Sequence, residues 1–174
     1  MNRRDEIREQ KKMGTAMQVL AWIVLLGFGV VWFGDVLEKQ RNPNQSLQTH
    51  VREGGIREVV LKRNRFGHYV TSGKIKGKPV TFMLDTGATG VAIGQATATA
   101  LGLKRGRAFP TQTANGVSTS YAVNLDRVSV GDIELNDVAA GISPGLGTEE
   151  VLLGMSFLKH IEFTQRGDTL ILRQ

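Results

Sequence analysis

The sequence predicts an all-β domain preceded by a single membrane-spanning helix. Three observations support this fold class: a long uncharged apolar run near the N-terminus, short strand-like runs separated by turn residues over most of the remainder, and 41% hydrophobic with only 22% charged residues. The composition excludes a disordered or collagen-like chain. Because the 174 residues include no cysteine, disulfides, thiol redox chemistry, zinc–thiolate sites and iron–sulfur clusters are excluded as well.

The apolar run covers residues 13–34, between Lys11-Lys12 and Asp35. As a helix it would be roughly 33 Å long, enough to cross a hydrocarbon core of about 30 Å. A buried core helix and a cleavable signal peptide are the alternatives. The run exceeds the usual ~7–15-residue apolar region of a signal peptide, and Trp32-Phe33-Gly34 is a poor cleavage site. We therefore expect an uncleaved signal anchor that lies in the lipid bilayer.

The charges on either side of this run predict its orientation. Five basic residues precede it, whereas only Lys39 and Arg41 lie in the stretch just after it. By the positive-inside rule, residues 1–12 form a cytoplasmic tail. The rest of the chain then lies outside the cytoplasm, which in a bacterium is the periplasmic side of the inner membrane.

Residues 35–55 are polar and show no apolar periodicity, so we expect a flexible linker. The remaining residues, 56–174, are enough for one domain with one core. Strand-like runs rich in valine, isoleucine, leucine and threonine are expected at Glu58–Lys62, Gly67–Ile75, Pro79–Leu84 and Ser118–Val130.

Two hairpins and two short helical segments complete the expected elements. One hairpin would close near Lys76-Gly77. The strongest turn signal is Asn115-Gly116, because both residues tolerate the positive φ of a type I′ turn, and its arms would be Thr111–Ala114 and Val117–Val123. The helical segments are Gln95–Leu101, ended by Gly102, and Phe157–His160.

Two motifs could carry chemistry. In the first, the apolar strand Val80–Leu84 leads directly into the turn Asp85-Thr86-Gly87-Ala88, which places a carboxylate at the end of a strand. In the second, the apolar run Val151–Leu153 ends at Gly154 and continues into a helical turn. Taken alone, each motif could be an ordinary strand and turn.

In their order along the chain, the Asp-Thr-Gly-Ala turn, the Asn115-Gly116 hairpin and the Val151-Leu152-Leu153-Gly154 segment resemble the retropepsin-like (clan AA) aspartic proteases. The resemblance covers about residues 56–174 and is closest to the membrane-anchored bacterial branch. It implies a closed β-barrel or sandwich with a flap hairpin, and an aspartic endopeptidase that acts on an extended peptide or protein substrate without a cofactor.

The resemblance also implies roles for single residues. Asp85 would activate water, Thr86 would orient the paired turns through its hydroxyl, and Gly87 would let substrate approach its backbone. The other implied contacts are Ala88 lining the cleft, Asn115, Gly116 and Val117 at the flap tip, and Gly154 packed close to the Asp85 turn.

Catalysis by this class needs two carboxylates that share one proton, because like charges a few ångströms apart cannot both ionise. The chain has one Asp-Thr-Gly. Asp126, Asp132, Asp137 and Asp168 lack the strand-to-glycine context of a second catalytic carboxylate. We therefore expect a homodimer with Asp85 of each subunit on the two-fold axis, and greatest activity on the acid side of neutral. The resemblance makes Thr169–Leu172 a candidate for an inter-subunit sheet.

Two other functional hypotheses remain open at this point. A membrane-tethered module with the same fold could bind an extended peptide without cleaving it, since fold does not fix function. Alternatively, the enzyme could cleave its own exposed segment at residues 35–54 and release the domain.

Several other signals point to no additional function. Gly141–Gly145 fits the G-x-S-x-G pattern, but Pro144 lacks the N–H that an oxyanion hole requires, so we expect a loop there. His50, His68 and His160 are scattered, so no metal site is expected. Glu149-Glu150 is interpreted as a solvated loop. The net charge of +6 comes with no nucleic-acid-binding motif, so no nucleic-acid partner is expected.

Overall fold

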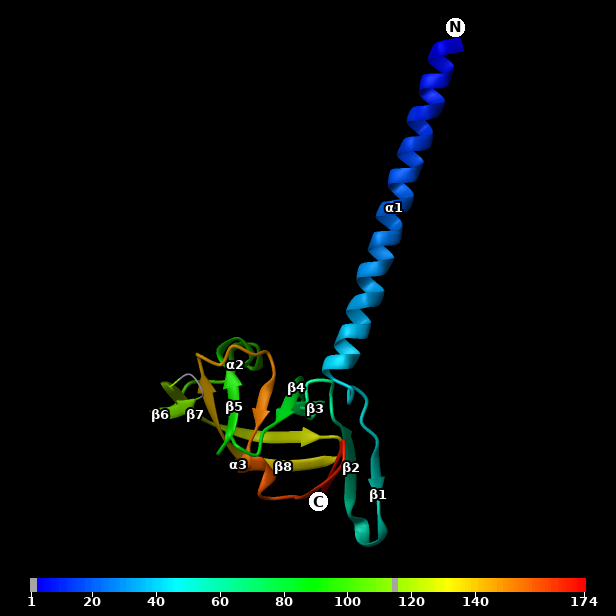
Figure 1. Cartoon of the computed structure of the whole chain (residues 1–174). Coiled ribbons are helices and arrows are strands. Elements are labelled where there is room, and N and C mark those ends of the chain that lie inside the picture. The colour runs from blue at the N-terminus through cyan, green and yellow to red at the C-terminus, as the bar shows by residue number, and fades with distance from the viewer. Residues whose placement is uncertain (1–2, 114–115) are drawn as a thin grey trace. The chain divides into compact units, whose positions relative to one another are not determined.

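The computed structural model describes residues 3–113 and 116–174 and divides into two compact units, residues 1–39 and 40–174 (Figure 1). The helices are α1 (Arg3–Arg41), α2 (Gln95–Leu101) and α3 (Met155–Leu158), with a 3₁₀ turn at Glu53–Gly55. The strands are β1 (Thr49–Val51), β2 (Arg57–Lys62), β3 (Val70–Ile75), β4 (Lys78–Leu84), β5 (Val91–Gly94), β6 (Ala108–Thr113), β7 (Gly116–Val130), β8 (Ile133–Ser143), β9 (Val151–Leu153), β10 (Glu162–Arg166) and β11 (Thr169–Arg173).

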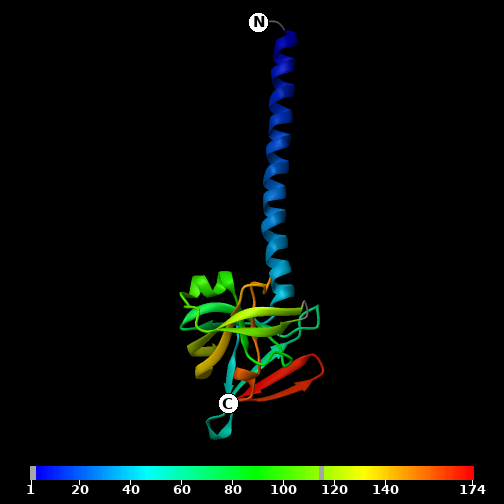
Figure 2. The ribbon, with the colours of Figure 1, turned by 90° about the vertical axis from the view of Figure 1, so that its left-hand side faces the viewer.

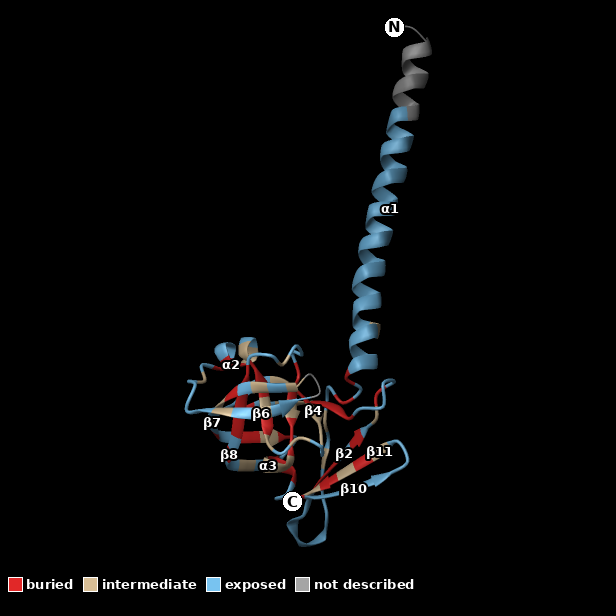
Figure 3. Ribbon diagram, turned by 60° about the vertical axis from the view of Figure 1, so that its left-hand side comes forward, coloured by how far each residue is buried: buried red, intermediate tan, exposed pale blue. Residues whose placement is uncertain are grey.

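Helix α1 contains the predicted apolar run and is longer than it at both ends. Its segment Lys12–Arg41 has the length and composition to cross a membrane, with a mean hydropathy of 2.1. Its apolar side chains are not covered by protein: Trp22 is 60% exposed and Phe28 73% exposed. Figure 3 shows this exposure along the helix. The alternative of a buried core helix is therefore wrong.

The stretch predicted as a flexible linker is ordered from residue 40 onward. Helix α1 continues to Arg41, and residues 49–51 form β1 at the edge of a sheet. Between them, the side chains of Asn42 and Asn44 are buried. The prediction of a flexible coil was wrong here because these asparagines are bonded to residues far along the chain.

Asn44 has the densest set of these hydrogen bonds. Its Nδ2 donates to the carbonyl oxygens of Lys62 (2.8 Å) and Val70 (2.7 Å), and its Oδ1 accepts from the N–H of Lys62 (2.8 Å). Its backbone forms a bridge to Thr71 in β3. A protease binds its substrate as an extended, accessible peptide. The buried bonds of Asn44 therefore argue against self-cleavage at this point.

We predict that Asn44→Ala lowers the free energy of unfolding of the domain by about 2–3 kcal/mol, because it leaves the N–H of Lys62 and the carbonyls of Lys62 and Val70 without this partner. Pulse proteolysis of the full chain in detergent over a urea series measures this change. The control is Gln45→Ala at the exposed neighbouring position. Equal stability of the two variants would contradict the structural role of Asn44.

The larger sheet has seven strands in the order β3-β4-β9-β5-β8-β7-β6. A further pairing of β3 with β7, at Lys74 with Ser129 and Ile75 with Val128, joins two strands that are far apart in this order. The sheet therefore curls back on itself, which confirms the predicted β-barrel or sandwich. Figure 1 shows α2 and α3 at opposite ends of β5. This is expected, because α2 follows β5 whereas α3 follows β9, and β9 runs antiparallel to β5.

The local turn signals agree with this fold. The β3–β4 hairpin closes at Lys76 and Gly77, both with positive φ (52° and 79°). Helix α2 ends at Gly102 in the left-handed region, as predicted. One interpretation needs correction: Gly141, Ile142 and Ser143 are not a loop but the buried end of β8.

The smaller sheet has the order β1-β2-β11-β10. β11 pairs with β2 on one side and with β10 on the other, and the β10–β11 hairpin is the red element in Figure 2. Both edges of β11 are therefore occupied by strands of the same chain. The expectation that Thr169–Leu172 adds to an inter-subunit sheet is wrong, because a strand with two partners has no free backbone groups for a third.

A cluster of ion pairs extends across the strands of this sheet. Glu58 in β2 is buried, and its carboxylate accepts hydrogen bonds from Arg52 Nη2 (2.5 Å) and Arg173 Nε (2.8 Å). Arg173 also pairs with Glu162 at 3.2 Å. The bonds from Arg52 and Arg173 lower the pKa of Glu58, against the opposing effect of burial.

This lowered pKa predicts a specific loss of stability in acid. The Glu58 ion pairs contribute fully above the unfolded-state pKa of about 4.3, and the contribution falls as the pH drops through the lower folded-state pKa. We expect Glu58→Gln to unfold more easily at pH 7 and to lose less additional stability than wild type below about pH 4. Urea midpoints measured from pH 7 to pH 3 test this. The control is Glu53→Gln, at an exposed position, which should follow wild type.

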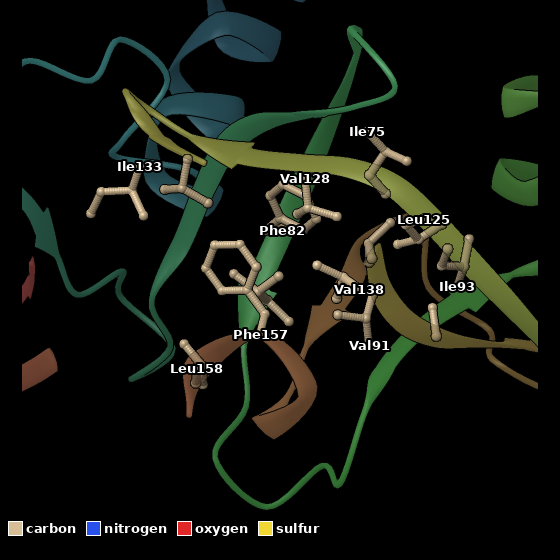
Figure 4. Packing of buried hydrophobic residues seen from close by; sticks show 14 of the residues in the cluster. Ile75, Phe82, Val91, Ile93, Leu125, Val128, Ile133, Val138, Phe157 and Leu158 are labelled. Atoms are coloured by element: carbon tan, nitrogen blue, oxygen red, sulfur yellow. The ribbon is translucent and has the colours of Figure 1, made fainter. Parts of the chain in front are cut away.

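The core joins both sheets to the segments that carry the candidate motifs (Figure 4). Phe82 in β4 and Phe157 in α3 are fully buried and lie among the side chains of Val128, Val138 and Leu158. Each buried phenylalanine contributes about 1.5–3 kcal/mol. Phe82 lies three residues before Asp85, and Phe157 three residues after Gly154. One core therefore fixes both motifs.

Candidate active site

Asp85 and Gly154 lie at the same edge of the larger sheet. β4 and β9 are parallel neighbours, with Leu84 paired to Leu153 as the last residues of their strands. Parallel strands end at a common edge, so the Asp85 turn and the start of α3 meet there. The Asp85 N–H donates to the carbonyl of Leu153 at 3.2 Å, which joins the two chain segments directly.

The turn itself is held by its own hydrogen bonds. The carboxylate Oδ1 of Asp85 accepts from the N–H of Gly87 at 2.9 Å, and the backbone N–H of Ala88 donates to the carbonyl of Asp85 at 3.2 Å. Asp85 is half-buried, whereas Thr86 and Gly87 are exposed. The carboxylate is therefore fixed in orientation while the turn beside it remains open to solvent.

Gly154 packs against this turn so closely that no side chain fits. A Cβ there would lie 2.6 Å from the carbonyl oxygen of Ala88 and 2.3 Å from that of Gly90. The N–H of Met155 donates to the same Ala88 carbonyl at 2.8 Å. The backbone of the turn is thus clamped from the α3 side.

Ser156 is a supporting residue that the sequence motifs did not point to. Its hydroxyl accepts a hydrogen bond from the N–H of Val91 at 2.9 Å, so α3 also holds the segment that leaves the turn and enters β5. A serine in a helical turn carries no local signal for this bond, because its partner lies 65 positions away.

Thr86 differs from its neighbours in the turn because its side chain faces outward. It is exposed, and within the described part of the chain its hydroxyl makes no hydrogen bond. The hydroxyl next to the candidate carboxylate is therefore available to a group outside this chain.

The predicted flap corresponds to the β6–β7 hairpin. Thr113 pairs with Gly116 at its end, and the Thr113 hydroxyl donates to the carbonyl of Gly116 at 2.8 Å. Ala114 and Asn115 at the tip lie outside the described residues. Val117 is 73% exposed. No hydrogen bond among the described residues joins this hairpin to the Asp85 turn.

The outer part of this hairpin is paired on one side only. β7 pairs with β8 only from Tyr121 onward, where Tyr121 faces Ile142, whereas residues 116–120 pair with β6. The outer part of the hairpin is therefore a two-stranded arm, and such an arm can bend more easily than a strand held on both sides.

Several other carboxylates of the domain are engaged elsewhere. Asp126 pairs with Lys76 and Asp168 with Arg63. Glu150 was predicted to be solvated, but it is buried and pairs with Arg41 at 2.7 Å, and this bond lowers its pKa. The prediction failed because the arginine is 109 positions distant.

Two further sequence signals can now be placed. The hydroxyl of Ser143 is buried, lies 2.7 Å from that of Ser120, and does not sit in a strand-to-helix elbow. It therefore has no nucleophile geometry. Among the described residues, no group of three or more histidine, aspartate or glutamate side chains could hold a metal ion.

A barrel-like β domain with an Asp-Thr-Gly turn packed against a glycine that directly follows a neighbouring strand is typical of the aspartic-protease class. Residues 71–160, a stretch of 90 of the 174 residues, match the family described as "gag-polyprotein putative aspartyl protease". The chain belongs to this retropepsin-like family.

The chain is also similar to two curated relatives and to a solved structure. The chain is 34% identical over 123 residues to an uncharacterized protein of Sinorhizobium sp., covering 68% of this chain and 53% of the relative, and 30% identical over 122 residues to one of Rickettsia prowazekii, covering 67% and 52%. It thus spans about half the length of these curated relatives. It is also similar to a crystal structure described as a retropepsin-like aspartic protease from Rickettsia conorii, with a TM-score of 0.58, 29% identity, and coverage of 74% of this chain and 95% of that one.

Proposed function

We propose that the chain is a membrane-anchored aspartic endopeptidase that is active as a homodimer, with Asp85 of both subunits forming one catalytic dyad. The observation that carries the proposal is the orientation of Asp85. Its carboxylate is fixed at the end of β4 by Gly87, in a turn that remains open to solvent. A carboxylate in this position can bind and deprotonate a water molecule.

The reaction would be hydrolysis of a peptide bond. One ionised Asp85 takes a proton from water as the oxygen attacks the peptide carbonyl, and the protonated Asp85 of the other subunit donates its proton to the carbonyl oxygen. The C–N bond of the tetrahedral intermediate then breaks as the Asp85 that took the water proton gives it to the amine nitrogen. The other Asp85 takes a proton back from one of the two hydroxyls on the carbon, which leaves a carboxylic acid and an amine and restores the dyad. Because the dyad must hold one proton, activity should be greatest on the acid side of neutral.

Two features of the turn support the dimer. The chain supplies one Asp-Thr-Gly carboxylate, whereas the reaction needs two. The exposed Thr86 hydroxyl beside it makes no hydrogen bond within the described part of the chain, so it is suited to bond the same turn of a second subunit. An isologous interface would place the two turns face to face on its axis.

The remaining site residues would act on substrate. Val117, Gly116 and Asn115 would cover the bound peptide as the two-stranded arm closes and excludes bulk water. Ala88 and Gly87 would lie along the cleft floor. By the positive-inside rule, helix α1 would leave its basic end in the cytoplasm and hold the protease domain outside it, in a bacterium on the periplasmic side of the inner membrane.

The test is cleavage of a diverse peptide mixture by the full chain in lipid nanodiscs or detergent, compared with Asp85→Ala, over a range of pH and protein concentration. We expect cleavage by wild type only, a maximum below pH 7, and a rate per chain that rises with concentration in detergent as dimers form. Cleavage that persists in Asp85→Ala would contradict the proposal. Peptide binding without cleavage by wild type at every pH and concentration would support a non-catalytic module instead.

A further inference from the structure

The loop of residues 63–68, between β2 and β3, carries an exposed aromatic residue beside an arginine. Phe66 is 60% exposed, and the guanidinium of Arg65 lies over its ring at 4.8 Å from the centroid. A single exposed apolar residue is common and by itself means little. The hydrogen bonds that fix this loop are what make the Arg65–Phe66 pair informative.

Asn64 builds the loop and bonds it to the last turn of helix α1. Its Oδ1 accepts from the N–H groups of Phe66 (3.0 Å) and His68 (2.9 Å), so the loop has one fixed shape. Its Nδ2 donates to the carbonyl of Arg41 at 2.9 Å, and Asn64 is buried. The Nη1 of Arg65 donates to the side chain of Gln40 at 2.5 Å.

The distance along the helix places these contacts near the membrane surface. The first charged residue after the apolar run is Asp35, and helix α1 continues without a break to Arg41. Six residues of helix rise about 9 Å. The headgroup layer on one side of a bilayer is about 5–8 Å thick, and a tilted helix brings its end nearer still. Because Gln40 and Arg41 follow Asp35 by only five and six residues, a loop bonded to them is tethered within about 9 Å of the end of the apolar run, close to the outer margin of this layer.

The chemistry of the loop suits anionic headgroups. Arg65 bonds to the neutral amide of Gln40 and pairs with no carboxylate in the described part of the chain, whereas Arg63 is neutralised by Asp168 at 2.6 Å. A cation and an aromatic ring at the same tip are typical of residues that lie in the membrane interface.

We propose that Arg65 and Phe66 dock on the lipid headgroups and hold the domain against the bilayer. This contact rests on the membrane anchoring in the proposed function, but does not depend on catalysis. It supplies a second attachment beyond helix α1, which limits the rotation of the domain about its anchor and lets the two subunits of a dimer meet in a restricted orientation.

The absence of native cysteine allows a clean test with single-cysteine labels. A fluorophore on His68→Cys, which leaves Arg65 and Phe66 in place, reports on the loop. Matched labels at Val30→Cys and Gln165→Cys report on the anchor and on an exposed strand of the domain. The full chain is reconstituted in nanodiscs of phosphatidylethanolamine and phosphatidylglycerol, with and without a lipid that carries a nitroxide on its headgroup or, for the label at 30, in its acyl chain.

We expect headgroup quenching of the label at 68 to be about threefold greater than that of the label at 165. It should fall toward the level at 165 when Phe66→Ser and Arg65→Gln are introduced together, or when the anionic lipid is replaced by phosphatidylcholine. Quenching at 68 that neither change lowers would overturn the docking, because the bond of Asn64 to Arg41 would then account for it alone. Equal quenching at 68 and 165, with the label at 30 quenched from the acyl chains, would overturn the docking and leave the anchor standing. Lack of quenching at 30 would overturn the anchor and the docking together. Loss of peptide cleavage alone would concern only the protease.

Discussion

Asp85→Asn should lower the rate of peptide cleavage by about 10³–10⁴-fold or more, with little change in the folded structure, because it removes the group that moves the proton. Asparagine retains the size of aspartate and can accept the Gly87 hydrogen bond through its side-chain oxygen, so the turn keeps its shape. Cleavage is measured with the peptides that wild type cuts, and pulse proteolysis verifies the fold. A variant that is stable but as active as wild type would rule out Asp85 as the catalytic group.

Mixing the two proteins tests whether one carboxylate from each chain is required. If subunits exchange freely, a ninefold excess of Asp85→Asn should reduce the activity per wild-type chain about tenfold, because most wild-type subunits then pair with an inactive partner. The control is the same excess of a folded protein that cannot pair with wild type, because it is reconstituted alone in separate nanodiscs. Activity that does not change with the excess would point to a site completed within one chain.

The sequence predicted those parts of the fold that depend on neighbouring residues. The β3–β4 hairpin at Lys76-Gly77 and the end of α2 at Gly102 follow from local backbone preferences, and both are confirmed. The strand that leads to Asp85 and the run that ends at Gly154 were also recognised, because apolar runs broken by glycine are local signals as well.

What the sequence did not predict depends on bonds between distant residues. Asn44 and Asn64 look like linker and loop residues, yet their side chains bond to the carbonyls of Lys62 and Arg41 within the domain. Glu150 looks solvated until Arg41 is placed beside it. The expectation of a subunit interface at β11 came from the family resemblance, and nothing in the sequence argued against it, because β10, which covers one edge of β11, has a weak apolar pattern.

Within the candidate site, the same distinction holds. The position of Asp85 could be predicted from its strand and glycine, whereas the clamp on its turn could not. The clamp consists of Met155 bonded to Ala88 and of Ser156 bonded to Val91, and these bonds require that β4 and β9 be parallel neighbours. That pairing is a property of the whole sheet, and no residue of either strand signals it alone.

Gly154→Ala should test this clamp with a large effect, although a smaller one than loss of the carboxylate. The new Cβ would lie 2.3 Å from the carbonyl oxygen of Gly90 and 2.6 Å from that of Ala88. Both are backbone atoms, and the Ala88 carbonyl is already bonded to Met155, so neither can move without shifting the Asp85 turn. Overpacking of this kind costs about 1–3 kcal/mol or more, and a displacement of about 1 Å at a catalytic group costs about 100-fold in rate.

We therefore expect Gly154→Ala to lose about 3 kcal/mol of stability and to retain about one hundredth of the wild-type cleavage rate per folded molecule. Pulse proteolysis gives the folded fraction by which the rate is divided, so a turn that is merely displaced is separated from a domain that is unfolded. The control is Gly147→Ala, where a Cβ meets nothing within 4 Å and φ is not positive, and this variant should behave as wild type. If both alanine variants cleaved equally well, the close approach of Gly154 to the turn would not position Asp85, and the hydrogen bonds of Leu153 and Met155 would have to hold the turn by themselves.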